Sequence, residues 1–125
     1  MEEVAYRLGL RNRFRGITER QGLLVRGAVG WAEWSPFAEY TRPEIDAWWQ
    51  ATLEAAEIGF PAPVRDTVPV NVTVPAVAPE VAHRIVSVSG CRTAKVKVAE
   101  PGQAFGDDLA RVEAVRDALG PDGRI

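Results

Sequence analysis

The sequence has a single cysteine and no excess of basic residues. Cys91 can form no disulfide within the 125-residue chain, which argues against a secreted scaffold held together by disulfides. The net charge is −2, so the basic surface typical of a nucleic-acid-binding domain is missing. No apolar run approaches the roughly 20 residues of a membrane-spanning helix, and Glu2 and Glu3 stand where a signal peptide carries positive charge. We expect a soluble, cytoplasmic protein with no nucleic-acid or membrane partner.

The chain is long enough for an ordinary folded domain, because 46% of its residues are hydrophobic. Its last residues, 119–125 (LGPDGRI), read as a helix end, a turn and the first step of another strand. We therefore expect a fragment of a longer protein. A complete eight-stranded barrel of about 250 residues cannot fit in this length.

The first half of the chain predicts a small α+β unit. Residues 4–10 alternate as a strand, and residues 16–22 are predicted to be a loop. Residues 23–26 and 31–34 indicate a hairpin with a glycine-bearing turn. A helix is expected from Pro43 to about Ile58, with Thr41 and Glu44 at the spacing of a capping box.

The second half begins after a proline-rich linker at residues 60–63 and predicts a β/α repeat. Residues 68–75 and 93–99 alternate as strands, and residues 79–89 and 107–119 have helical spacing. Val81, Ile85 and Val88 are expected to face inward in the first helix, and a stripe of Leu and Val in the second. Alternation of strand and helix implies parallel strands.

The lysine-bearing strand carries the strongest chemical signal. Lys95 and Lys97 share one face, and Val96 and Val98 share the other. Two ammonium groups about 7 Å apart repel by roughly 2 kcal/mol at an effective dielectric constant near 20. A sheltered pair of this kind is typical of a lysine that acts as a base, because a neighbouring cation favours the neutral form. A half-buried strand with solvated lysines has the same pattern.

Three arginines at a spacing of two residues, Arg11, Arg13 and Arg15, lie beside Phe14. The guanidinium group matches a carboxylate in shape, so this segment could bind an acidic ligand. A solvated strand end would have the same composition.

Four segments, in this order and with these spacings, resemble the N-terminal part of the o-succinylbenzoate synthase family, and most closely its actinobacterial branch. They are residues 30–37 (GWAEWSPF), 68–75 (VPVNVTVP), 93–99 (TAKVKVA) and 117–125 (DALGPDGRI). These lyases belong to the enolase superfamily and act in menaquinone biosynthesis. The resemblance implies an α+β capping domain at residues 1–64. It also implies that residues 65–125 are the first β/α units of a modified TIM barrel, ending at the start of its third strand.

The resemblance also assigns roles to individual residues. Lys97 would be the base that removes the proton α to a carboxylate and returns it to the departing hydroxyl, and Lys95 would support it electrostatically. Arg15 would lie in the cap loop that closes over a small carboxylate substrate, 2-succinyl-6-hydroxy-2,4-cyclohexadiene-1-carboxylate. Mg²⁺ would stabilise the charge that develops, with ligands expected beyond residue 125 and none within the chain.

We therefore expect the isolated chain to be inactive. Two other functions remain open. One is an N-acylamino acid racemase or dipeptide epimerase of the same superfamily, which needs a second base on the opposite face of the substrate. The other is a non-enzymatic α+β binding module in which Lys95 and Lys97 are solvated.

Overall fold

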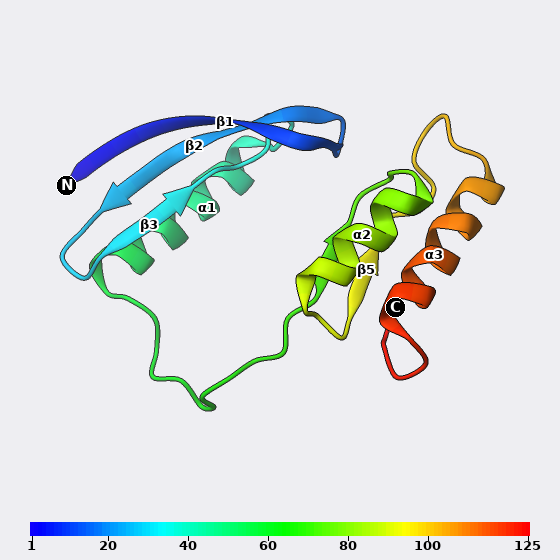
Figure 1. Cartoon of the computed structure of the whole chain (residues 1–125). Coiled ribbons are helices and arrows are strands. Elements are labelled where there is room, and N and C mark those ends of the chain that lie inside the picture. Colours follow the sequence, from blue (N-terminus) through cyan, green and yellow to red (C-terminus); the bar gives the residue numbers. More distant parts are fainter. The chain divides into compact units, whose positions relative to one another are not determined.

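The computed structural model describes residues 1–125, which form two compact units (Figure 1). The first unit comprises Met1–Arg11 and Ile17–Val64, and the second comprises Asn12–Gly16 and Arg65–Ile125. Each unit has its own sheet and its own buried residues, and each is described by itself.

The first unit contains a three-stranded sheet. Its strands are β1 (Glu2–Phe14), β2 (Ile17–Arg26) and β3 (Trp31–Trp34), in the order β1-β2-β3. The end of β1, from Asn12 to Phe14, groups with the second unit. β2 and β3 are antiparallel, with Leu23 opposite Trp34. This pairing confirms the hairpin predicted from residues 23–26 and 31–34.

The loop predicted at residues 16–22 is wrong, because β2 already begins at Ile17. The turn needs only Arg15 and Gly16, which both have positive φ (50° and 79°) as a two-residue hairpin turn requires. Gly22 lies inside β2 for a different reason. A Cβ at this position would lie 2.7 Å from the Trp34 carbonyl oxygen, so its glycine marks a close approach of backbone and not a break.

Helix α1 (Arg42–Glu57) packs on β2 and β3, and it begins with the predicted capping box. The Glu44 carboxylate accepts hydrogen bonds from the Thr41 backbone N–H (2.7 Å) and hydroxyl (2.8 Å). These two hydrogen bonds hold the pKa of Glu44 below its ordinary value. Trp34 and Trp49 meet edge to face at 5.7 Å between ring centroids, joining the sheet to the helix.

The turn between β2 and β3 lies against the end of α1. The backbone N–H groups of Val29 and Gly30 donate to the carbonyl oxygen of Ala56, at 2.9 and 3.3 Å. A Cβ added to Gly27 would lie only 2.6 Å from that same oxygen. The contact between turn and helix therefore depends on a residue without a side chain at position 27.

The second unit has the predicted order of strand, helix, strand and helix. These are β4 (Val72–Val74), α2 (Pro79–Ser89), β5 (Ala94–Val96) and α3 (Phe105–Leu119). β4 and β5 are parallel, which confirms the expectation from the β/α alternation. Thr93 also forms an isolated parallel bridge with Arg124, so the last residues lie along the other side of β5.

Apolar side chains from both strands and both helices form the core of this unit. They are Val74, Ala82, Val86, Ala94 and Val115. Figure 1 shows α2 and α3 side by side next to the strands. The face opposite to Val74 and Ala94 carries the polar side chains of the two strands, as the alternation predicts.

Three details of the predicted packing are wrong. Leu109, expected in the apolar stripe of α3, is 48% exposed. β4 is shorter than residues 68–75, and Val68 and Val70 are exposed. Val88 is 79% exposed, although it was expected to face inward. Ala82 and Val86 form the buried face of α2, and Val88 follows Val86 by two residues, which is about 200° around the helix.

Replacing Gly27 by alanine should destabilise the first unit by about 1–3 kcal/mol, because the new methyl group would overlap the main chain at Ala56. Urea unfolding followed by tryptophan fluorescence would measure the loss, since all four tryptophans lie in this unit. Gly9→Ala is the matched control, because nothing lies within 4 Å of its added Cβ. Equal unfolding midpoints for the two variants would contradict the close contact at Gly27.

Candidate active site

Lys95 of β5 and Lys97, which directly follows β5, border a small pocket within the second unit. The pocket has a volume of about 190 Å³ and is lined by Phe14, Arg15, Thr73, Lys95 and Lys97. All five residues belong to the second unit, because the segment Asn12–Gly16 groups with it. Three of the five side chains are cationic, so the pocket has the charge that an acidic small molecule would require.

The parallel register explains why these side chains meet. Thr73 lies opposite Lys95 in the ladder, and Val74 lies opposite Val96. Side chains alternate across each strand, so Thr73 and Lys95 share the face opposite to the buried Val74. The backbone N–H of Lys97 continues the ladder by donating to the Val74 carbonyl oxygen at 2.9 Å.

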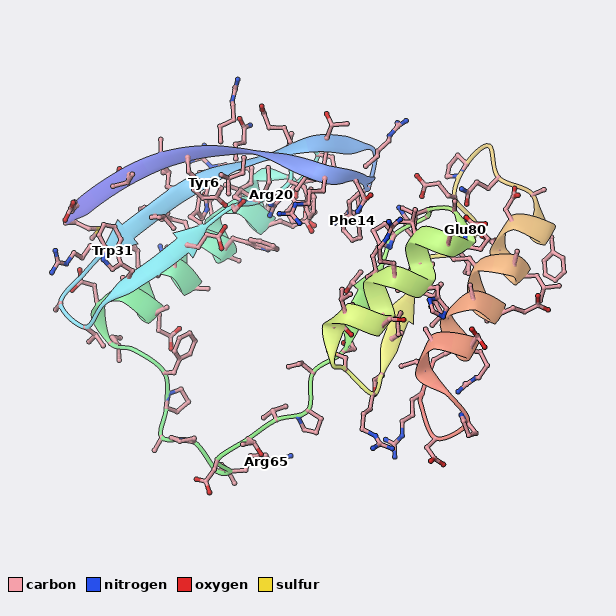
Figure 2. All side chains as sticks on the ribbon, viewed as in Figure 1. Tyr6, Phe14, Arg20, Trp31, Arg65 and Glu80 are labelled. Carbon is pink, nitrogen blue, oxygen red and sulfur yellow. The ribbon has the colours of Figure 1, made fainter.

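Lys97 is more enclosed than Lys95. The Lys97 side chain is 30% exposed, and its Nζ lies 5.6 Å from the centroid of the Phe14 ring. Figure 2 labels Phe14 at the end of the β1–β2 hairpin. The sheltered pair of lysines expected from the sequence is present only in part: both line the pocket, but Lys97 is partly exposed and Lys95 is exposed.

Lys97 contacts a carboxylate that was not among the predicted site residues. Glu100 Oε2 lies 2.6 Å from Lys97 Nζ, and the Glu100 side chain is 23% exposed. The charge nearest to Lys97 is therefore negative, although the sequence suggested the positive charge of Lys95. The spacing of three residues could have suggested this pair, but Glu100 reads as an ordinary loop residue.

The other predicted residue, Arg15, also lines the pocket. It lies in the turn with φ of 50°, an uncommon conformation for a residue with a side chain. Arg13 belongs to the same segment of the second unit but does not line the pocket. Of Arg13 and Arg15, the structure therefore brings only Arg15 to the lysines.

Arg111 on α3 is the most buried charged residue of the chain, and it contacts the main chain of Lys97. Only 1% of its surface is exposed, and its guanidinium donates to the main-chain oxygens of Val77 (2.8 Å) and Lys97 (3.0 Å). It also donates to Asp108 Oδ1 at 2.8 Å and to Gln103 Oε1 at 2.5 Å. The stripe predicted on this helix named apolar residues only. Position 111 precedes the buried Val115 by one helical turn, and this spacing could have identified it.

Asp108 joins Arg111 to the residue two positions after Lys97. Its second oxygen accepts the backbone N–H of Ala99 at 2.8 Å. The hydrogen bond from Ala99, together with the one from Arg111, holds the pKa of Asp108 below its ordinary value. Ala99 has φ of 56°, so the chain turns sharply where this carboxylate binds it.

The residues of the chain do not by themselves form a magnesium site. No group of three or more His, Cys, Asp or Glu side chains in residues 1–125 could hold a metal ion. Mg²⁺ binds mainly to carboxylates, phosphates and water, and the hydroxyl of Thr73 is the only side-chain oxygen in the pocket lining.

None of the helices is long and apolar enough to cross a membrane.

Part of the chain matches a known protein family. Residues 5–56 match the family described as enolase N-terminal domain-like, in agreement with the α+β fold of the first unit. The chain is similar to proteins named o-succinylbenzoate synthase, which confirms the resemblance seen in its motifs. It is 69% identical to the one from Thermobifida fusca over 121 residues, which cover 97% of the chain and 38% of that protein.

Two further relatives carry the same name. The synthase of Mycolicibacterium smegmatis is 53% identical over 113 residues, and that of Mycobacterium tuberculosis strain H37Rv is 49% identical over 113 residues. Each match covers 90% of the chain and 35% of the relative. The chain therefore spans little more than a third of the length of the curated relatives it matches.

The second unit should be sensitive to acid through Asp108. Because the folded pKa of Asp108 is lowered, its contribution to stability is complete above the unfolded value of about 3.9 and is lost as the pH falls through the folded value. We expect the free energy of unfolding to fall as the pH is lowered below about 5. Asp108→Asn should show a shallower fall than the unaltered chain in urea titrations followed by circular dichroism.

Asp122→Asn is the control for this measurement, because Asp122 is exposed. It should keep the pH dependence of the unaltered chain. Equal slopes for Asp108→Asn and the unaltered chain would contradict the role of the Asp108 hydrogen bonds.

Proposed function

We propose that this chain is the N-terminal part of an o-succinylbenzoate synthase and carries the catalytic base of that enzyme. The observation that carries the proposal is the pocket in which Lys97, Lys95 and Arg15 meet, in a chain 69% identical to a protein named o-succinylbenzoate synthase. In this proposal residues 1–64 are the capping domain, and residues 65–125 are the first β/α units of a modified TIM barrel.

The barrel assignment is supported by the parallel pairing in the second unit. β4 and β5 are parallel neighbours joined through α2, and Arg124 pairs in parallel with Thr93 on the other side of β5. Three parallel segments in chain order, each joined to the next by a helix, are the beginning of a β/α barrel. Lys97 follows the carboxyl end of β5, and active sites of such barrels lie at the carboxyl ends of the strands.

Lys97 is proposed as the group that moves the proton. As a neutral amine it would remove the hydrogen α to the substrate carboxylate. As an ammonium it would then return that proton to the departing hydroxyl, so that a C–H and a C–O bond break, a C=C bond forms and water leaves. The structure has Lys97 paired with Glu100, and the ammonium of this pair must lose a proton before Lys97 can act as a base.

The other two cations of the pocket have separate roles in this proposal. Lys95 would support Lys97 electrostatically, and Arg15 would bind the acidic substrate, 2-succinyl-6-hydroxy-2,4-cyclohexadiene-1-carboxylate. The Phe14 ring lies near the Lys97 ammonium and would cover it on one side. The resemblance also implies Mg²⁺. Because the described residues do not form a site for it, the proposal places its ligands in the part of the relatives that this chain does not span.

A hybrid enzyme tests the function. This chain would replace the matching 121 residues of the Thermobifida fusca protein, and formation of o-succinylbenzoate would be measured with Mg²⁺ present. We expect turnover by the hybrid and a loss of about 10²–10⁴-fold in Lys97→Ala, because general acid–base catalysis contributes about that much.

Arg84→Ala is the control, because it removes one positive charge from an exposed position of α2. It should leave turnover within about twofold. A hybrid that racemises an N-acylamino acid and does not dehydrate the proposed substrate would favour the racemase. A Lys97→Ala hybrid with unchanged turnover would contradict the assignment of the base.

A further inference from the structure

Arg111 is the buried centre of a polar network, although it does not itself line the pocket. Its guanidinium is surrounded by four acceptors from four places in the second unit. They are the main-chain oxygens of Val77 and Lys97 and the side-chain oxygens of Gln103 and Asp108. A buried guanidinium needs such partners, because its donors lose the hydrogen bonds of water.

The network connects the carboxyl ends of both strands to α3. Val77 follows β4 by three residues, and Lys97 follows β5 directly. Arg111 therefore binds the main chain near the end of each parallel strand. Its planar guanidinium sets the distance between the Val77 and Lys97 carbonyl oxygens. This geometry suits arginine, whose donors form a rigid fork, and does not suit lysine.

Stability alone gives a poor explanation of this arrangement. In the Arg111–Asp108 ion pair the guanidinium is buried and the carboxylate is 15% exposed. An ion pair with a buried member is often no more stabilising than well-packed apolar side chains of similar volume. An apolar residue at position 111 would also continue the buried stripe that ends at Val115. A guanidinium at this position fixes the path of the main chain at Lys97, which an apolar side chain could not do.

The second carboxylate oxygen of Asp108 acts on the same short segment. It accepts the N–H of Ala99, whose φ of 56° turns the chain immediately after the lysine strand. Arg111 and Asp108, which bind each other, thus hold both flanks of Val98. The backbone from Lys97 to Ala99 cannot shift unless this pair rearranges.

We propose that Arg111, oriented by Asp108, is a positioning residue that fixes the backbone at Lys97 and so directs the Lys97 amine toward the pocket. The inference rests on the proposed function of Lys97. Arg111 does not line the pocket and touches no substrate in this account. Its effect passes through the Lys97 carbonyl group.

The composition of the chain permits a direct test, because Lys95 and Lys97 are its only lysines. Reductive methylation of the 125-residue chain with ¹³C-formaldehyde gives two side-chain dimethylamine signals and one from the α-amino group. Lys95→Arg and Lys97→Arg assign them. The Lys97 signal should be displaced by the Phe14 ring, which lies 5.6 Å from its Nζ.

In Arg111→Met the Lys97 signal should move toward the shift of a free methylated lysine, while the Lys95 signal stays in place. Arg111→Gln should not restore it, since one amide group cannot reproduce the fork. Arg116→Met is the matched control on the same helix. Arg116 also donates to main-chain oxygens, those of Gly120 and Gly123, at the opposite end of α3 from Asp108.

Gln103→Ala keeps the test decisive if Arg111→Met does not fold. It removes one acceptor of the network at an exposed loop position, and it should displace the Lys97 signal in the same direction by a smaller amount. An unchanged Lys97 signal in a folded Arg111→Met variant would overturn the proposal. So would equal displacement of the Lys95 and Lys97 signals, which would indicate general loosening.

The hybrid enzyme adds a kinetic measurement that separates the two proposals. Arg111→Met should lower kcat by about 10²-fold, because a misplacement of about 1 Å can cost that much, while KM changes little. Arg116→Met should leave both constants near those of the hybrid. A hybrid without any turnover would overturn the proposed function, and the lysine signals of the isolated chain would still decide the role of Arg111.

Discussion

The parallel ladder between β4 and β5 determines the organisation of the second unit. Its register places Thr73 beside Lys95 and Val74 beside Val96, so one face of the strands is polar and the other is apolar. The apolar face is buried by Ala82, Val86 and Val115 of the two helices. Because side chains alternate along a strand, a register shifted by one residue would exchange the two faces.

The main chain at the carboxyl ends of β4 and β5 is held by hydrogen bonds to charged side chains and not by hydrophobic contact. Arg111 reaches the main chain after each strand, and Asp108 binds the turn at Ala99. Most of the buried side chains of this unit therefore lie at the apolar face of the strands. The Arg111–Asp108 ion pair fixes the path of the main chain at the carboxyl ends of the strands. Lys97 lies just after β5, and a pocket residue outside a strand needs such a constraint, since loops otherwise vary more than the elements they connect.

Local signals predicted much of the fold from the sequence. The spacing of Thr41 and Glu44 gave the start of α1, and the proline and glycine at the two ends gave α2 its bounds at Pro79 and Ser89. The predictions failed where a distant contact overrides the local signal. Gly22 was read as a loop residue, but it allows the Trp34 backbone to approach β2.

The candidate site was predictable to a similar extent. Lys95, Lys97 and Arg15 were named from a strand pattern and a family resemblance, and the structure brings all three to one pocket. Glu100 and Arg111 were missed. A charged residue on a helix usually faces solvent, and nothing in the sequence shows that the oxygens of Val77 and Lys97 lie within reach of position 111.

The register of the ladder is the central claim, and it can be observed directly. A scalar coupling across the hydrogen bond between the Lys97 amide nitrogen and the Val74 carbonyl carbon, measured by NMR on the ¹⁵N,¹³C-labelled chain, reports that pair alone. The account predicts a resolved correlation for this pair, whose nitrogen and oxygen are 2.9 Å apart. A correlation from the Lys97 amide to any other carbonyl would contradict the account, because Thr73 would then no longer lie opposite Lys95.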